Sequence, residues 1–226
     1  MEEWKNDDEL FALIRSELFT AVVGDILDKL GYLHQFLPPA LRPLHDKMVM
    51  VGRAMTVLEA DIDQISDSRL LKKPFGLMLE ALDDLKKNEV YICSGASPTY
   101  ALWGELMATR ARLLGAAGAV VDGYSRDTSG ILAMEFPCFS YGGYAQDQEP
   151  RGKVVNYRVP IHCGQVLIEP GDIVFGDRDG VCVIPQKVER EVLVKAFEKA
   201  RAEKMVKTKI EEGMNACDAF SKYGVI

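Results

Sequence analysis

The spacing of apolar residues predicts two short helices at the start of the chain, then a loop and a strand. From Asp8 to about Leu30 the chain reads "DELFALIRSEL" and "TAVVGDILDKLG", with apolar residues every three to four positions. Thr20 is placed to cap the second helix, and Gly31 to end it. The segment "HQFLPPALRPLHDKM" contains three prolines and predicts an irregular loop across the surface. After it, "VMVGRAMTVLEA" predicts a strand.

The middle of the chain has the pattern of a βαβ unit. Residues 75–87, "FGLMLEALDDLKK", predict a helix, and "EVYIC" predicts a short buried strand that ends at Ser94. A helix around Ala101 to Leu114 and the strand "GAVVDG" follow. Short links between strand, helix and strand require a parallel pair with a right-handed crossover. The fold class is therefore α/β.

The second half of the chain is rich in β-structure and ends in a long helix. Short apolar runs punctuated by Pro and Gly predict a mostly antiparallel sheet or barrel. From Lys187 to Glu212 a charged helix follows, with a thin apolar stripe through Val192, Val194, Phe197 and Met205. No internal repeat or linker interrupts the sequence. We expect a single domain over residues 1–226, with residues 187–226 as a helical C-terminal arm.

Charge and composition narrow the classes of partner. The net charge of −7 argues against a nucleic acid partner. Five scattered cysteines without CxxC spacing indicate buried, reduced thiols in a cytoplasmic protein. The acidic, amphipathic start is unlike a signal peptide, and no apolar run approaches the roughly 20 residues that cross a bilayer. We expect a small-molecule ligand, and no nucleic acid or membrane partner.

Two polar dipeptides, Gly104-Glu105 and Arg126-Asp127, follow the predicted strands of the βαβ unit. Ligands of α/β proteins bind at the carboxyl ends of parallel strands, so the loops after "VYIC" and "AVVDG" should face each other. The amides of Leu106 and Met107, near the start of the helix, are available to a small carboxylate, and Gly104 has no Cβ to keep an anion away.

The charged residues in these dipeptides each have two interpretations. Arg126 can fork onto a carboxylate or an enolate oxygen. Asp127 is either the salt-bridge partner of Arg126 or a ligand of Mg²⁺ or Mn²⁺, and "GYSRDTSG" supplies the turn that aims both side chains at one site. Glu105 is either a second carboxylate, acting as an outer ligand or an acid and base, or a first-turn Glu that favours the helix dipole.

The spacing of Gly104-Glu105, twenty intervening residues and Arg126-Asp127 resembles the signature of the class II pyruvate aldolases of the RraA-like superfamily. These aldolases cleave 4-hydroxy-4-methyl-2-oxoglutarate or 4-carboxy-4-hydroxy-2-oxoadipate. The resemblance extends over most of the chain, through "TAVVGDILDKLG", "AVVDGYSRD" and "EPGDIVFGDRDGVCVIP". It implies a swivelling β/β/α fold, assembled as a homotrimer or homohexamer with active sites between subunits.

The resemblance also implies a role for each site residue. Asp127 would bind Mg²⁺ or Mn²⁺ directly, with Glu105 acting through a metal-bound water. Arg126 and the amides of Leu106 and Met107, beside Gly104, would hold the pyruvate part of a 4-hydroxy-2-oxo acid. Glu203 from the neighbouring subunit is the candidate that completes the metal shell. Pyruvate and a carbonyl compound would be the products, with oxaloacetate decarboxylation as a side activity.

One residue departs from the family pattern. The characterised aldolase has Asp where this chain has Glu105, and one methylene moves a carboxylate by about an ångström, enough to change a proton-transfer geometry. We therefore expect an altered substrate preference.

Two other functions compete with the aldolase. The superfamily includes a regulator of ribonuclease E, which binds a protein partner and lacks the metal-binding Asp, so Asp127 favours the enzyme. A phosphohistidine carrier would need a His in an exposed active loop, whereas His34, His45 and His162 are interpreted as ordinary polar or interface residues. No lysine lies among the candidate residues, which disfavours a Schiff-base aldolase.

The aromatic residues next to the two dipeptides also have more than one interpretation. Tyr100 and Trp103 either cover the substrate as an aromatic lid or pack in an interface, and Tyr124 is a candidate for shaping the distal part of the pocket. The "GDRDG" segment at residues 176–180 is too short for a calcium loop and predicts a tight hairpin turn.

Overall fold

The computed structural model describes residues 4–224 and is organised around one long strand, β2 (Met50–Asp61). Its sheet has the order β1-β7-β5-β3-β2-β11-β12, and β8 pairs with the second half of β2 beyond β11. A register shift between Leu58 and Glu59 marks a bulge in β2. The remaining strands of this sheet are β1 (Arg42–Pro43), β3 (Glu89–Ser94), β5 (Gly118–Val121), β7 (Cys138–Ser140), β8 (Gly152–Tyr157), β11 (Ile173–Asp177) and β12 (Gly180–Ile184).

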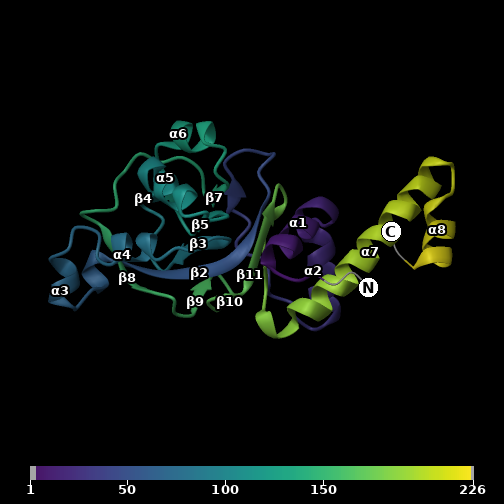
Figure 1. Cartoon of the computed structure of the whole chain (residues 1–226), viewed down its shortest axis with the longest axis horizontal. Helices are drawn as coiled ribbons and strands as arrows, with labels where there is room; N and C mark the ends of the chain where they lie inside the picture. The colour runs from purple at the N-terminus through teal and green to yellow at the C-terminus, as the bar shows by residue number, and fades with distance from the viewer. Residues whose placement is uncertain (1–3, 225–226) are drawn as a thin grey trace.

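Helices cover one face of this sheet and a β-hairpin covers the other. α4 (Met78–Asp83), α5 (Glu105–Leu113) and α6 (Thr128–Ala133) lie above the sheet in Figure 1, and β9 (Ile161–Cys163) and β10 (Val166–Ile168) lie below it. Side chains alternate between the two faces along each strand. Tyr91 and Cys93 of β3 therefore pack in the core under the helices, and Val90 and Ile92 pack in the core under the hairpin.

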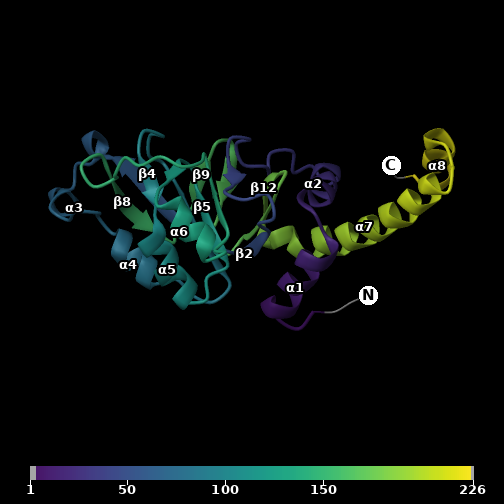
Figure 2. The same cartoon turned by 90° about the horizontal axis from the view of Figure 1, so that it is seen from above.

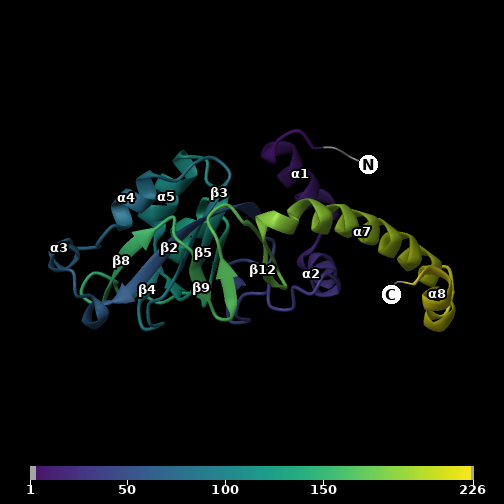
Figure 3. The same ribbon diagram turned by 90° about the horizontal axis from the view of Figure 1, so that it is seen from below.

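A third core joins the terminal helices to the edge of the sheet. α1 (Asp7–Glu17), α2 (Thr20–Lys29) and the first half of α7 (Glu189–Glu211) enclose apolar side chains of β11 and β12. The second half of α7 extends away from the body of the molecule, with α8 (Ala216–Tyr223) at its far end (Figures 2 and 3). The short elements η1 (Ile62–Gln64), α3 (Ser68–Leu71) and η2 (Gln186–Val188) complete the connections in these regions.

The predicted α/β class and its βαβ unit are confirmed. β3 and β5 are parallel neighbours with α5 between them in sequence, and the β-rich second half and long C-terminal helix are present. The "GDRDG" hairpin is also confirmed, because Asp177 pairs with Gly180 at the turn between β11 and β12. The proline-rich loop is irregular except for an isolated β-bridge at Phe36 and the two residues of β1.

Two helix boundaries differ from the prediction. The helix expected from Ala101 begins at Glu105, because residues 101–103 form the strand β4 (Ala101–Trp103). The helix expected over residues 75–87 is limited to α4, since Phe75 and Leu77 instead make backbone hydrogen bonds to Val154 of β8.

Thr20 does not cap α2, contrary to prediction. Phe19 occupies the cap position, and Thr20 is the first helical residue. Its amide and hydroxyl donate to the two carboxylate oxygens of Asp177, at 2.7 and 2.8 Å. A carboxylate from the β11–β12 turn thus caps this helix from a distant part of the chain.

The apolar stripe of α7 is broader than predicted at its start. Val192 and Phe197 are buried as expected, but Val194 is half-buried and Met205 is 47% exposed. The buried positions also include Leu193, Ala196 and Ala200, because the first half of α7 packs on both α1 and α2. Val206, in the second half of α7, is buried as well.

Cysteine burial follows the prediction at four positions. All five cysteines are free thiols, but Cys217 on α8 is exposed.

Within residues 4–224, no helix is both long and apolar enough to cross a membrane.

Candidate active site

A small parallel sheet brings the two polar dipeptides together. β4 pairs with β6 (Tyr124–Ser125), with Ala101 opposite Tyr124 and Trp103 opposite Ser125. The Arg126 amide then donates to the Trp103 carbonyl at 2.8 Å. Gly104 and Arg126 therefore leave adjacent strand ends, although twenty-one residues separate them in sequence.

The start of α5 is an uncapped helix N-terminus beside these residues. Gly104 has an extended backbone (φ −147°, ψ 178°) and provides no side-chain cap, and its carbonyl accepts the first helical hydrogen bond, from the Ala108 amide at 3.0 Å. The amides of Leu106 and Met107 therefore have no acceptor within the helix. A Cβ at Gly104 would lie 3.1 Å from Asp127 Oδ2 and 3.4 Å from Arg126 Cγ. The absence of a side chain here lets the two charged residues approach the helix start.

The turn predicted for Asp127 is present. Asp127 has a left-handed backbone (φ 55°, ψ 34°) at the start of α6, a conformation that Asp adopts more readily than most residues. Its Oδ2 lies 3.6 Å from Arg126 Nε, so the predicted ion pair forms, although loosely. The side chain of Asp127 is half exposed.

Asp147, which the sequence did not single out, is the closer partner of Arg126. Its Oδ1 lies 2.9 Å from Arg126 Nη1 and also accepts from the Gln148 amide at 2.8 Å. Asp147 thus orients Arg126, and the backbone of the loop that contains Asp147 holds this carboxylate in place. This pairing leaves Asp127 with only the longer contact to the guanidinium.

Glu105 lies against the first turn of α6. A Cβ at Gly130 would lie only 2.1 Å from Glu105 Cδ, so the carboxyl group rests in the space that this glycine leaves. The Gly130 amide in turn donates to the Asp127 carbonyl at 3.0 Å. Glu105 therefore packs against the helical turn that follows Asp127. Its place in the first turn of α5 is also favourable for the helix dipole.

A cavity of about 410 Å³ opens beside these residues. Gly104, Leu106, Met107, Arg126 and Asp127, which the sequence put forward as site residues, all line it. The other lining residues were not predicted as pocket residues, apart from Trp103 in the proposed lid: Phe75, Met78, Leu79, Leu82, Asp83, Ala101, Leu102, Trp103, Arg110, Asp147 and Gln148. Neither a lysine nor a histidine is among these described lining residues, and Glu105 lies outside them.

The aromatic residues next to the site are not a lid. Tyr100 and Trp103 are each only 1% exposed. Tyr100 donates its hydroxyl to Asp61 Oδ1 at 2.6 Å, and the Trp103 ring stacks on Phe136. These contacts place both rings in the core. Tyr124 packs against other tyrosines and is not among the described residues that line the cavity.

A buried carboxylic acid supports the cavity wall from behind. Glu59, beside the bulge of β2, is 1% exposed, and its Oε2 accepts from Gln148 Nε2 at 2.7 Å. Burial raises the pKa of Glu59 to about 8. Three buried side-chain atoms of the described residues have no hydrogen-bond partner: Glu59 Oε1, Tyr91 OH and Trp103 Nε1. Gln148 thus links the cavity to a polar group in the core.

The carboxylates suit a water-rich metal site rather than a closed one. No group of three or more His, Cys, Asp or Glu residues within 4–224 is arranged to hold a metal. Mg²⁺ accepts one or two carboxylates and completes its shell with water. Asp127, with Glu105 nearby and room left by Gly104, matches that donor chemistry.

Glu203 is not brought to this site within one chain. It lies on the projecting half of α7, where its carboxylate pairs with Lys199 at 2.6 Å. Lys199 also pairs with Asp25 of α2. Residues of α1, α2 and α7 line a different cavity there, which includes Glu203.

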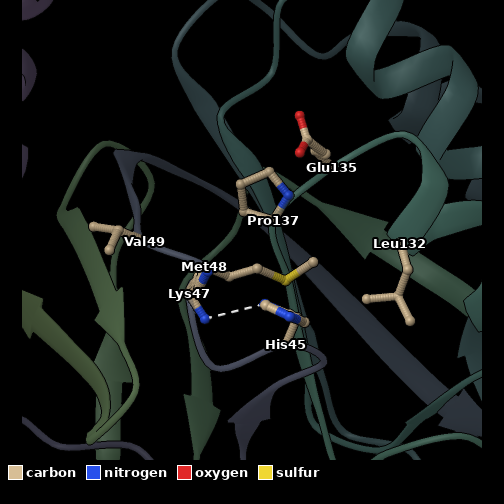
Figure 4. Close-up of a pocket in the computed structure, with 7 residues that line it drawn as sticks. All are labelled: His45, Lys47, Met48, Val49, Leu132, Glu135 and Pro137. Carbon is tan, nitrogen blue, oxygen red and sulfur yellow. Dashed lines mark hydrogen bonds between the residues drawn. The ribbon is translucent and has the colours of Figure 1, made fainter.

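Another cavity, of about 430 Å³, is lined by His45 and by none of the predicted site residues (Figure 4). Its lining includes Lys47, Met48 and Glu135, and His45 Nδ1 accepts from the Lys47 amide at 3.2 Å. His34, His45 and His162 are all exposed. Glu135 is the sole acidic residue among the described lining, so the cavity lacks the paired charges found beside Gly104.

Comparison with known proteins identifies the family. The model of the RraA-like family, described as Aldolase/RraA, matches residues 20–183. A protein of Halalkalibacterium halodurans, provisionally named 4-hydroxy-4-methyl-2-oxoglutarate aldolase, is 33% identical over 202 residues, which are 89% of each chain. A similarly named protein of Pseudomonas paraeruginosa is 27% identical over 73% of this chain and 94% of its own.

Solved structures agree with this assignment. An uncharacterised protein from Pseudomonas syringae pv. tomato has a TM-score of 0.80 and 25% identity, covering 96% of this chain and 99% of its own. A Streptomyces coelicolor member of the RNase ES inhibitor RraA family has a TM-score of 0.78 at 22% identity, covering 90% and 98%, and shares the fold. The chain belongs to the RraA-like family.

Proposed function

We propose that this protein is a divalent-metal-dependent pyruvate aldolase, a carbon–carbon lyase that cleaves a 4-hydroxy-2-oxo acid to pyruvate and a carbonyl compound. The observation that carries the proposal is the meeting of Arg126 and Asp127 with the uncapped start of α5 at Gly104, beside one cavity. The names of the bacterial relatives support the aldol reaction.

The amides of Leu106 and Met107, together with Arg126, bind the carboxylate and 2-oxo oxygens of the substrate. A helix N-terminus and a guanidinium both favour an anion, and both are fixed before substrate arrives. Asp147 holds the guanidinium in position at 2.9 Å. Negative charge that develops on the 2-oxo oxygen during bond cleavage is therefore met by groups that need no rearrangement.

Asp127 would hold the metal, either Mg²⁺ or Mn²⁺, as a direct ligand, and Glu105 would interact with the metal through a water molecule. When bound, the metal supplies Lewis-acid stabilisation of the pyruvate enolate. Glu105, through a water molecule, accepts the proton of the C4 hydroxyl as the C3–C4 bond breaks and later returns a proton to C3. Loss of CO₂ from oxaloacetate leaves the same enolate, so decarboxylation is an expected side activity.

The proposed assembly is a cytoplasmic homotrimer or homohexamer of single-domain subunits. The projecting half of α7 carries Glu203 away from the cavity of its own chain, which is consistent with Glu203 reaching the site of a neighbouring subunit.

Pyruvate release coupled to lactate dehydrogenase tests the reaction. The substrates are 4-hydroxy-2-oxohexanoate, 4-hydroxy-4-methyl-2-oxoglutarate and oxaloacetate, each with Mg²⁺, Mn²⁺ or EDTA. We expect metal-dependent pyruvate from at least one hydroxy acid and from oxaloacetate. Absence of pyruvate from all three, with no metal bound, would contradict the proposal and favour a non-catalytic regulator that binds a protein partner.

A further inference from the structure

Asp147, the closer partner of Arg126, lies in a loop without regular structure. Residues 144–151 belong to no helix or strand. The side chain of Asp147 is 40% exposed, so packing around it does not fix its direction. Its Oδ1 nevertheless lies 2.9 Å from Arg126 Nη1. The orientation of the guanidinium therefore depends on the contacts that anchor this loop.

Gln148, the next residue, anchors the loop to the core. It is 3% exposed, and its Nε2 donates to Glu59 Oε2 at 2.7 Å. Its backbone amide donates to Asp147 Oδ1 at 2.8 Å. Its carbonyl accepts from the amides of Arg151 and Gly152, at 2.8 and 2.9 Å. Gln148 is thus bonded to the Asp147 carboxylate through its backbone and to the core through its side chain.

Glu59 is an unfavourable residue for the stability of the core. It is 1% exposed, and its Oε1 has no hydrogen-bond partner among the described residues. Its Oε2 is paired, and the donor is Gln148. A buried polar atom without a partner costs free energy. Stability therefore does not explain a carboxyl at this position, whereas holding Gln148 does.

We propose that Glu59 is a positioning residue for the active site, which acts through Gln148 on the carboxylate of Asp147. Asp147 in turn holds the Arg126 guanidinium toward the carboxylate of the substrate. The inference rests on the proposed function for the role of Arg126. All four residues belong to the same chain, so their contacts do not depend on a neighbouring subunit.

Binding of pyruvate, measured by calorimetry with Mg²⁺ present, tests the inference without relying on turnover. Glu59→Met is similar in length and removes the acceptor for Gln148, whereas Glu59→Gln keeps it. We expect Glu59→Met to bind pyruvate roughly tenfold more weakly, because Arg126 no longer presents a fixed donor to a charged acceptor. Glu59→Gln should bind pyruvate as the wild type does.

Melting temperatures show whether the variants keep the fold. The Ala101 amide donates to the Gln146 carbonyl at 2.9 Å, so the loop keeps an anchor on β4 when Glu59 is changed. Glu59→Met leaves the Gln148 amide unpaired, which lowers stability. Glu59→Met/Gln148→Met leaves neither group unpaired, and it should show the same loss of pyruvate affinity at a melting temperature nearer that of the wild type.

Tyr91→Phe is the matched control. It removes another buried polar atom that has no partner, and Tyr91 lies outside the described residues that line the cavity. We expect it to bind pyruvate as the wild type does.

The Asp147→Ala background tests the route of the effect. If Glu59 acts through Asp147, Glu59→Met should cause no further loss of pyruvate affinity in that background. A general loosening of the fold would cause the same loss in both backgrounds.

Equal pyruvate affinities of the wild type and Glu59→Met would overturn the inference. So would equal losses in Glu59→Met and Glu59→Gln, wild-type affinity in the double methionine variant, or an undiminished effect in the Asp147→Ala background. Failure of the proposed function has a different signature, namely that the variants bind pyruvate in the expected order while no 4-hydroxy-2-oxo acid yields pyruvate. A wild type that binds no pyruvate would overturn both.

Discussion

Gly104 is the residue on which the arrangement of charges depends most directly. Its backbone is extended, so alanine is compatible with the local conformation, but a Cβ would lie 3.1 Å from Asp127 Oδ2. Gly104→Ala should therefore displace the carboxylate and lower kcat/KM for pyruvate release at least tenfold, because small misplacements of reacting groups are costly.

Thermal unfolding and steady-state kinetics check this prediction together. Gly143→Ala is the control, since a Cβ there would make only ordinary contacts with Thr128, at 3.5 Å. Both variants should keep a melting temperature near that of the wild type. Full activity in Gly104→Ala would mean that the close approach of Asp127 to the helix start has no catalytic role.

Glu59 makes stability depend on pH. Its pKa is about 8 in the folded protein and 4.5 in the unfolded chain. Between these values the folded state holds a proton that the unfolded state has released. The free energy of unfolding therefore falls as pH rises through this window, by up to about 1.4 kcal/mol per unit. The contribution is fully present below pH 4.5 and lost as pH rises to about 8.

Glu59→Gln keeps the acceptor for Gln148 and removes the titrating proton. Urea unfolding at pH 5 to 8 should show the variant gaining stability relative to wild type as pH rises. Glu198→Gln, at an exposed position of α7, serves as control and should follow the wild type. A Glu59→Gln profile parallel to the wild type would show that Glu59 ionises normally.

At the level of single residues, the sequence pattern identified cavity residues that lie next to predicted helices and strands. It missed residues that only the folded chain brings to the cavity. Gly104, Leu106, Met107, Arg126 and Asp127 were found because each pair flanks a predicted element, and all line one cavity. Asp147 and Gln148 lie in a loop without regular spacing, and the bulge of β2 directs Glu59 toward them. No local signal in the sequence reports such contacts.

Among the elements, the contact between α5 and α6 determines where the Glu105 carboxyl lies. Gly130→Ala would place a Cβ 2.1 Å from Glu105 Cδ, so this flexible side chain must move. Alanine is also a better helix former than glycine, by up to about 1 kcal/mol. We expect kcat to fall severalfold with no loss of stability.

The double variant Glu105→Ala/Gly130→Ala isolates that contact. If Glu105 carries the effect, Gly130→Ala should change kcat only when Glu105 is present, as a double-mutant cycle in pyruvate release would measure. Equal effects of Gly130→Ala in both backgrounds would assign the loss to α6 itself.

The secondary-structure prediction was right for elements with a long, regular pattern of apolar residues. It was wrong where contacts between distant parts of the chain determine where an element begins or how it is capped. The βαβ unit follows from strongly apolar strands around a helix. By contrast, β4 has three residues and exists because it pairs with β6, which has two, so the sequence pattern placed β4 in the following helix. The cap of α2 was misassigned for the same reason, since the carboxylate of Asp177 comes from a hairpin 157 residues away.

At the scale of the whole molecule, the projecting half of α7 separates Glu203 from the cavity of its own chain. If Glu203 completes the site of a neighbouring subunit, Asp127→Ala and Glu203→Ala should each be inactive alone. Subunit exchange between them should restore part of the activity, because some mixed sites carry both carboxylates. Activity measured before and after exchange checks this, and no recovery would show that Glu203 does not act between subunits.

The most direct test of the aldolase proposal combines metal binding and turnover in Asp127→Asn. Asparagine tolerates the left-handed backbone of this position, so the fold should be preserved while one carboxylate is lost. We expect the wild type to bind Mn²⁺ and release pyruvate from a 4-hydroxy-2-oxo acid, and the variant to lose both properties with an unchanged melting temperature. Pyruvate release that persists in Asp127→Asn, or in EDTA, would contradict a metal-dependent mechanism at this site.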